Sequence, residues 1–167
     1  MMKVICATLF LAISFSISSQ GQSVIEAPYK RFPTIPPVKL LLTDSSTFFT
    51  KEDLSKKKAT MIMLFSPDCD HCQHETEEII KHIDAFEKIQ ILMATIAPFD
   101  KMFDFFNKYD LKRFDNIVMG KDVNNLLPSF YDIRNFPFLA FYNKKKELIS
   151  VFEGSMLIQK IMEELRK

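Results

Sequence analysis

The chain has 167 residues, with 22 basic and 21 acidic side chains and a formal net charge of +1. This length suits a single domain with its own hydrophobic core, and the near balance of charge gives no case for a nucleic acid partner or an anionic membrane surface. Only three cysteines occur, Cys6, Cys69 and Cys72. A framework of structural disulfides is therefore excluded as the source of stability.

The first residues have the pattern of a secretory signal peptide. Lys3 precedes the apolar stretch 4–17, which is shorter than the ~20 residues that span a bilayer, and small and polar residues follow it. We expect residues 1–19 to be the signal peptide, with a cleavage site open by a few positions; a retained membrane anchor is the alternative. Cleavage removes Cys6, and it predicts a periplasmic or secreted protein without stable membrane insertion.

Two segments precede the central part of the chain. Residues 20–37 are expected to be an extended lead-in, because four prolines interrupt helix formation and inner-strand pairing there. The predicted domain covers residues 38–167. It begins with a β-hairpin formed by 38–42 and 47–50, and residues 51–58 follow as a short polar helix or turn.

Strand and helix patterns then alternate along the domain. Apolar runs without alternation indicate strands buried on both faces, and apolar residues at spacings of three and four indicate amphipathic helices. In chain order we expect a strand at 60–65, a helix after Cys72, a strand at 89–96, a helix at 101–109, a strand at 117–119, a helix at 122–130, a hairpin of 138–142 with 148–152, and a last helix after Gly154. This order predicts an α/β layered sheet, with parallel pairing first and antiparallel pairing last.

The residue patterns also predict details of these elements. In the helix at 101–109, Phe103 and Phe106 should face inward. Gly120 should end the preceding strand, Pro128 should break the helix that follows, and Ser155 should cap the last helix.

The pair Cys69 and Cys72 carries the clearest chemical signal. It stands between the apolar strand 60–65 and an amphipathic helix, so the first sulfur should lie at a helix N-terminus. Free backbone N–H groups and the helix dipole favour a thiolate there. A thiolate attacks disulfides, and a second cysteine one helical turn later resolves the mixed disulfide. A loop this short adds little stability, so the pair predicts redox chemistry.

With these features the chain resembles the thioredoxin superfamily, and most closely the exported TlpA-like thiol–disulfide oxidoreductases. The strand–Cys-x-x-Cys–helix unit carries the resemblance, together with the segment 131–143, which is similar to the cis-proline region of that family and the hairpin after it. The resemblance implies a thioredoxin-like three-layer fold. Its mixed central sheet would be flanked by helices, with an N-terminal β-hairpin and an inserted strand–helix.

The resemblance also implies roles for individual residues. Cys69 would be the exposed catalytic nucleophile and Cys72 the more buried resolving thiol. Pro137 would be the cis proline beside Cys69, and the backbone of Phe136 would pair with a substrate chain. Glu75 matches the acidic residue that the TlpA-like group often has three places after the second cysteine, which makes it a candidate proton relay.

Two departures from thioredoxin bear on the chemistry of the site. Met63 stands six residues before Cys69, where thioredoxin has a buried acid. Asp70 and His71 separate the cysteines and oppose each other, because a positive or hydrogen-bonding His71 favours the thiolate and the carboxylate of Asp70 disfavours it. Whether the protein oxidises, reduces or isomerises disulfides stays open.

The predicted function is that of an exported thiol–disulfide oxidoreductase that acts on protein disulfides through Cys69 and Cys72 without a cofactor. Its partners would be disulfide-bearing or dithiol envelope proteins and an upstream redox partner. The alternative is a Cu(I) or Zn binding or carrier module of the same fold, because Cys69, His71, Cys72 and His74 lie within six residues. A fold relic with an inert or structural disulfide is a further alternative.

Overall fold

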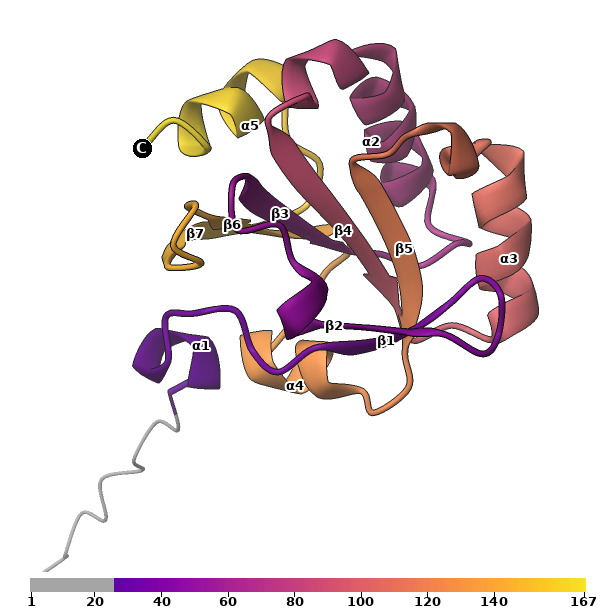
Figure 1. The fold of residues 1–167 in the computed structure, drawn as a ribbon, viewed down its shortest axis with the longest axis horizontal. Coiled ribbons are helices and arrows are strands. Elements are labelled where there is room, and N and C mark those ends of the chain that lie inside the picture. The colour runs from indigo at the N-terminus through magenta and orange to yellow at the C-terminus, as the bar shows by residue number, and fades with distance from the viewer. Residues whose placement is uncertain (1–25) are drawn as a thin grey trace, which may run out of the picture.

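The computed structural model describes residues 26–167, which form a mixed sheet with helices on both faces (Figure 1). The expected signal peptide and Cys6 lie outside the described residues. Within 26–167 no helix has both the length and the apolar character needed to cross a membrane.

The sheet has seven strands in the order β2-β1-β5-β4-β3-β6-β7. Its three inner strands β5, β4 and β3 run parallel, and the strands on either side pair antiparallel. The strands are β1 (Lys39–Leu42), β2 (Phe48–Thr50), β3 (Ala59–Leu64), β4 (Ile89–Thr95), β5 (Ile117–Asp122), β6 (Phe138–Tyr142) and β7 (Leu148–Glu153). Both expected hairpins are confirmed, β1 with β2 and β6 with β7.

The helices divide between the two faces of the sheet. Those on one face are α2 (Asp70–Lys81), α3 (Phe99–Lys108) and α5 (Ile158–Glu164), and those on the other are α1 (Pro28–Arg31) and α4 (Leu126–Tyr131) (Figure 1). This is the expected three-layer arrangement. The segment α3–β5 supplies the inserted helix and strand, between β4 and α4.

The inner strands are buried along their whole length, as their unbroken apolar sequences predicted. Every residue of β3 and β4 is buried. Successive side chains of β3 enter opposite cores, because a strand alternates its faces. Met61 and Met63 pack toward α2 and α3, whereas Ile62 and Leu64 pack toward α4.

The lead-in differs from the fully extended segment that we expected. Pro28–Arg31 form the short helix α1, with proline at its first position, where the missing N–H group has no helical partner to lose. Beyond α1 the chain is extended, and Thr34 forms an antiparallel bridge with Glu147. The lead-in therefore packs against the domain.

Two further expectations fail for packing reasons. In α3, Met102 and Phe105 are buried, Phe106 is half-buried and Phe103 is 41% exposed, so the inward position of Phe103 is wrong. The strand β5 also continues past Gly120, where a Cβ would lie 2.8 Å from the Cβ of Leu40. The glycine lets β1 approach closely and does not end the strand.

The last two corrections concern helix ends. Pro128 is the third residue of α4 and does not break it, because the first turn of a helix leaves its N–H groups without helical partners. Leu157 precedes α5, so Ser155 is not its cap. The Ser155 hydroxyl instead donates to the carbonyl oxygen of His71 at 3.2 Å, which joins the segment before α5 to the first turn of α2.

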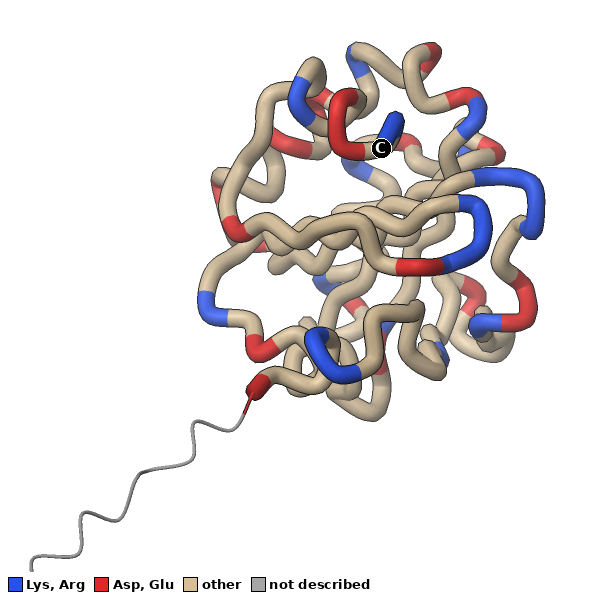
Figure 2. Tube along the Cα trace, turned by 90° about the vertical axis from the view of Figure 1, so that its left-hand side faces the viewer, with Lys and Arg blue, Asp and Glu red and all other residues tan. Residues whose placement is uncertain are grey.

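Charges of both signs are interspersed over the side of the molecule that Figure 2 shows. The turn between β6 and β7 contributes three successive lysines at 144–146, and acidic residues lie close by along the chain. This distribution agrees with the near-neutral composition.

Candidate functional site

Cys69 lies between the end of β3 and the first residue of α2. Its backbone is extended (φ −93°, ψ 115°), and its Sγ accepts a hydrogen bond from the backbone N–H of Cys72 at 3.2 Å. This is the geometry of a helix N-cap, with sulfur in the place of the usual oxygen. The N–H group and the helix dipole both favour negative charge on this sulfur.

Cys72 lies one turn further along α2 and is fully buried. It packs in the same core as Met63 and Ile79. Burial, first of all, and the adjacent Cys69 raise the pKa of the Cys72 thiol far above its ordinary value. Both cysteines are free thiols, Cys69 half-buried and Cys72 buried, which matches the asymmetry expected of a nucleophile and a resolving thiol.

The cis-proline segment lies against Cys69, although it is more than sixty residues away in sequence. The Phe136–Pro137 peptide bond is cis, as the resemblance implied. Antiparallel pairing of Leu64 with Phe138 brings the start of β6 beside the end of β3. The Cys69 S–H donates to the carbonyl oxygen of Phe136 at 3.9 Å. The oxygen of Pro137 accepts from Gly154 N–H at 2.7 Å, which fixes the segment to the end of β7.

Glu75 lies on the inner side of α2 and is only 1% exposed. Its Oε2 accepts a hydrogen bond from Met156 N–H at 2.8 Å, and its Oε1 has no partner among the described residues. Burial raises the pKa of this carboxyl, and the Met156 N–H opposes that shift. The Glu75 carboxylate also contributes to the raised pKa of Cys72. Since Met63 is apolar and buried, Glu75 is the acid placed near the resolving thiol.

Asp70 and His71 occupy the first turn of α2, and both are exposed. The backbone carbonyl of His71 accepts from Ser155. Their side chains face solvent next to a half-buried sulfur, so their influence on the thiolate is screened by water.

Side chains of the inserted helix α3 bind the turn before Cys69. The sequence patterns did not predict these contacts. Lys101 forms an ion pair with Asp68. Lys108 donates to Gln73 Oε1 at 2.9 Å, and Gln73 Nε2 donates to the carbonyl oxygen of Pro67 at 2.9 Å. The two lysines are seven residues apart, which places them on one face of a helix, and this spacing was the available signal.

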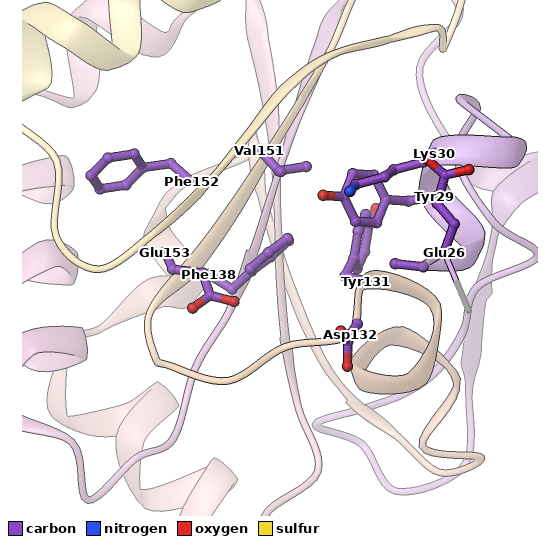
Figure 3. A pocket seen from close by; sticks show the side chains of 10 residues that line it. Glu26, Tyr29, Lys30, Tyr131, Asp132, Phe138, Val151, Phe152 and Glu153 are labelled. Carbon is purple, nitrogen blue, oxygen red and sulfur yellow. The ribbon is translucent and has the colours of Figure 1, made fainter. Parts of the chain in front are cut away.

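Several cavities open on the described part of the chain, and one of about 260 Å³ lies between the turn before Cys69 and α3. The α2 cavity has a volume of about 170 Å³ and lies between α2 and the segment 155–159. A larger cavity of about 660 Å³ lies by α1, α4 and β7 (Figure 3). Among the described residues no cysteine lines it. Its lining includes three aromatic side chains, Tyr29, Tyr131 and Phe138, and three charged ones, Lys30, Asp132 and Glu153.

The histidines and cysteines are not brought to one point. Cys72 is buried, whereas His71 and His74 are exposed. Among residues 26–167, no group of three or more His, Cys, Asp or Glu side chains is arranged to hold a metal ion. The donor cluster seen in the sequence is therefore not a preformed zinc site in this part of the chain.

No family model and no curated protein matches the chain, but solved structures do. DsbF of Mycobacterium tuberculosis has a TM-score of 0.66 and 19% identity over 80% of this chain and 98% of that chain. A secreted disulfide oxidoreductase of the same organism, homologous to E. coli DsbE, has a TM-score of 0.63 and 17% identity over 77% and 93%. The exposed lipoprotein thioredoxin Etrx1 of Streptococcus pneumoniae has a TM-score of 0.59 and 24% identity, over 78% of this chain and 98% of that chain. These similarities confirm the thioredoxin-like fold.

Proposed function

We propose that the protein is an exported thiol–disulfide oxidoreductase that acts on protein disulfides through Cys69 and Cys72. The observation that carries this proposal is the position of Cys69 Sγ. It lies at the N-terminus of α2, 3.2 Å from the Cys72 N–H and 3.9 Å from the Phe136 carbonyl oxygen. A half-exposed sulfur at a helix N-terminus, beside the backbone carbonyl of Phe136, is placed to attack a disulfide in an extended chain.

The first step joins Cys69 to the substrate. The Cys69 thiolate attacks one sulfur of the substrate disulfide, a mixed disulfide forms, and the other substrate sulfur leaves as a thiolate that takes a proton from solvent. The backbone of Phe136, held by the Pro137–Gly154 hydrogen bond, would pair with the substrate chain and align its sulfur with Cys69.

The second step resolves the mixed disulfide. Cys72 loses its proton and attacks Cys69 Sγ, the Cys69–Cys72 disulfide forms, and the second substrate thiolate leaves. Two electrons have then passed from the cysteine pair to the substrate. Running the steps in reverse oxidises a substrate dithiol, and an upstream redox partner would restore the starting state.

Glu75 is the proton relay in this proposal. The raised pKa of Cys72 makes a proton acceptor necessary, and the raised pKa of the buried Glu75 carboxyl brings it closer to that of a thiol. Asp70 and His71 would tune the thiolate on Cys69 from the solvent side.

The proposed substrates and redox partner are envelope proteins. The signal-peptide pattern of residues 1–19 supports export. Two of the similar structures belong to a secreted oxidoreductase and an exposed lipoprotein, which also favours this location.

The test is trapping of substrates in cells. A Cys72→Ser variant should accumulate mixed disulfides with envelope proteins through Cys69, and Cys69→Ser is the matched control that should trap none. The purified wild type should reduce insulin disulfides. The proposal fails if Cys72→Ser traps no more protein than the control and the wild type does not reduce insulin.

A further inference from the structure

The α2 cavity lies where the proton of the resolving step has to travel. Its lining includes Glu75, His74 and Glu78 on α2, His82 directly after α2, and residues 155–159 on the other wall. Its volume of about 170 Å³ accommodates a few waters, since one water occupies roughly 30 Å³ in the liquid. One wall carries the titratable side chains, whereas the other includes the apolar residues Met156, Leu157 and Ile158.

Neither Cys72 nor Glu75 can exchange a proton with solvent directly. Cys72 is fully buried and Glu75 is 1% exposed. Met63 and Ile79 pack in the core around Cys72 and have no titratable group. A proton that passes from Cys72 to Glu75 therefore needs a polar route onward from the carboxyl group.

Glu75 lines the cavity, and one of its two carboxylate oxygens differs from the other in hydrogen bonding. Oε2 accepts from Met156 N–H at 2.8 Å, whereas Oε1 is buried with no partner at hydrogen-bond distance among residues 26–167, although the nearby Ser155 hydroxyl helps to lower the pKa of the carboxyl. Leaving a buried carboxylate oxygen unpaired is costly, and a water in the adjoining cavity would donate a hydrogen bond to it. On the cavity rim, His74 is exposed and Glu78 is half-exposed, so the cavity connects Glu75 to solvent.

We propose that the α2 cavity is a water-filled proton conduit that links Glu75 to solvent during resolution of the mixed disulfide. This inference rests on the proposed function, because it supplies the path for the proton that Cys72 loses. The conduit joins the buried Glu75 carboxyl to the surface beside α2.

The proton and the bonds of the resolving step are accounted for by Glu75, the two cysteines and the substrate sulfur. A carboxylate oxygen of Glu75 takes the proton of the Cys72 thiol, and Cys72 Sγ attacks Cys69 Sγ. The Cys69–Cys72 bond forms as the bond between Cys69 and the substrate sulfur breaks, and the substrate leaves as a thiolate. Glu75 then passes its proton to the cavity waters and regains its charge. No further oxidant or reductant takes part.

The titratable groups around Glu75 come from α2 and the residue after it. Cys72 lies on the core side, His74 and Glu78 act on the carboxyl, and His82 lines the same cavity; the segment 155–159 carries no titratable side chain. The pH dependence of resolution should therefore reflect Glu75. Burial raises the pKa of Glu75, and the charge of His74 opposes that shift.

The two steps can be timed separately with the disulfide reagent dithiobis(nitrobenzoate). Attack by Cys69 releases one coloured thionitrobenzoate, and attack by Cys72 on the mixed disulfide releases a second. Glu75→Ala should leave the first release unchanged and slow the second by about a hundredfold, the lower end of what positioned proton transfer contributes. Glu77→Ala is the matched control, because Glu77 lies on the same helix, is exposed and does not line the cavity.

Chemical rescue then tests the conduit itself. Formate fits the space left by Glu75→Ala, so the second release should accelerate in proportion to formate concentration, whereas the bulkier pivalate should have no effect. Glu75→Gln should be slow without rescue, because its side chain fills that space. Adding Ser155→Phe to Glu75→Ala should abolish rescue by blocking the cavity, and Ser155→Ala should preserve it.

The outcomes separate the conduit from the proposed function. Equal rescue by formate and pivalate, or rescue that survives Ser155→Phe, overturns the conduit and leaves the redox proposal standing. Absence of a second release in the wild type overturns the redox proposal, and the conduit with it. If Glu75→Ala does not fold, Ser155→Phe alone still decides, since it should slow only the second release; an unchanged second release contradicts the conduit.

Discussion

The backbone N–H of Cys72 donates to the sulfur of Cys69 at 3.2 Å. The donor belongs to the peptide group of residue 72 and not to its side chain, so a substitution there keeps the hydrogen bond to Cys69. A Cys72→Ser variant therefore removes the resolving sulfur while it keeps the backbone hydrogen bond to the nucleophile. This separation makes the two steps of the reaction accessible one at a time.

The two cysteines should differ sharply toward alkylating reagents in the native protein. Cys69 is half-buried and Cys72 is fully buried with a strongly raised pKa, and alkylation needs an accessible thiolate. Brief treatment of the reduced protein with iodoacetamide near neutral pH should label Cys69 at least about a hundredfold faster than Cys72, as peptide mass spectrometry would report. Comparable labelling of both, in protein shown to be folded, would contradict the asymmetry.

The local pattern around the cysteines was readable from the sequence because it depends on neighbouring residues. The apolar run of β3, the Cys-x-x-Cys spacing and the helix after it are all contained in one segment. The position of Pro137 beside Cys69 came only through the family resemblance, since the pairing of β3 with β6 joins distant parts of the chain.

Other features depend on packing that no local pattern contains. Phe103 and Phe105 are both apolar and close in sequence, and only the direction in which α3 lies on the sheet decides that Phe105 is buried. The unpartnered Oε1 of Glu75 and the α2 cavity require the segment 155–159 to cover α2. The sequence could identify Glu75 as a candidate but not its isolation from solvent.

Removing the side-chain charge of Asp70 and removing the side chain of His71 should shift the reduction potential of the cysteine pair in opposite directions. Asp70→Asn removes a negative charge that disfavours the Cys69 thiolate, which stabilises the reduced form and raises the potential. His71→Ala should lower it. Both side chains are exposed, so each shift should be about 10–20 mV, the scale of a screened surface charge.

Equilibration with glutathione, followed by gel-shift alkylation, measures this potential, since the chain has no tryptophan to report it by fluorescence. Asp84→Asn is a suitable control on the segment after α2, because its charge lies well over two helical turns away from Cys69 along the chain. Shifts of the same sign for Asp70→Asn and His71→Ala would show that charge is not the cause.

The reduced protein should hold no stoichiometric zinc or copper after purification. Described residues 26–167 have no group of three or more ligands arranged for a metal, and Cys72 is buried while His71 and His74 are exposed. Metal analysis of the reduced protein, and insulin reduction with and without a chelator, provide the measurement. Stoichiometric metal that is lost in Cys69→Ser would instead support the carrier function.

The buried Glu75 carboxyl should make the folded protein less stable as pH rises. Its pKa is raised in the folded state, so the folded state favours the protonated form. This contribution to the free energy of unfolding is complete below the ordinary glutamate pKa of about 4.3 and is lost as pH rises through the folded-state pKa. Glu75→Gln, which stays neutral, should gain stability relative to the wild type between pH 4 and pH 8.

Urea denaturation of both proteins across this range measures the difference, with the cysteines reduced throughout. The matched control is Glu77→Gln, whose exposed side chain should give a difference that does not grow with pH. Glu75→Gln keeps an oxygen that can accept from Met156 N–H, so the pH-dependent part isolates the charge of the buried carboxylate. A difference between wild type and Glu75→Gln that stays constant from pH 4 to pH 8 would mean that Glu75 titrates normally in the folded protein, and it could then not serve as the proton acceptor for Cys72.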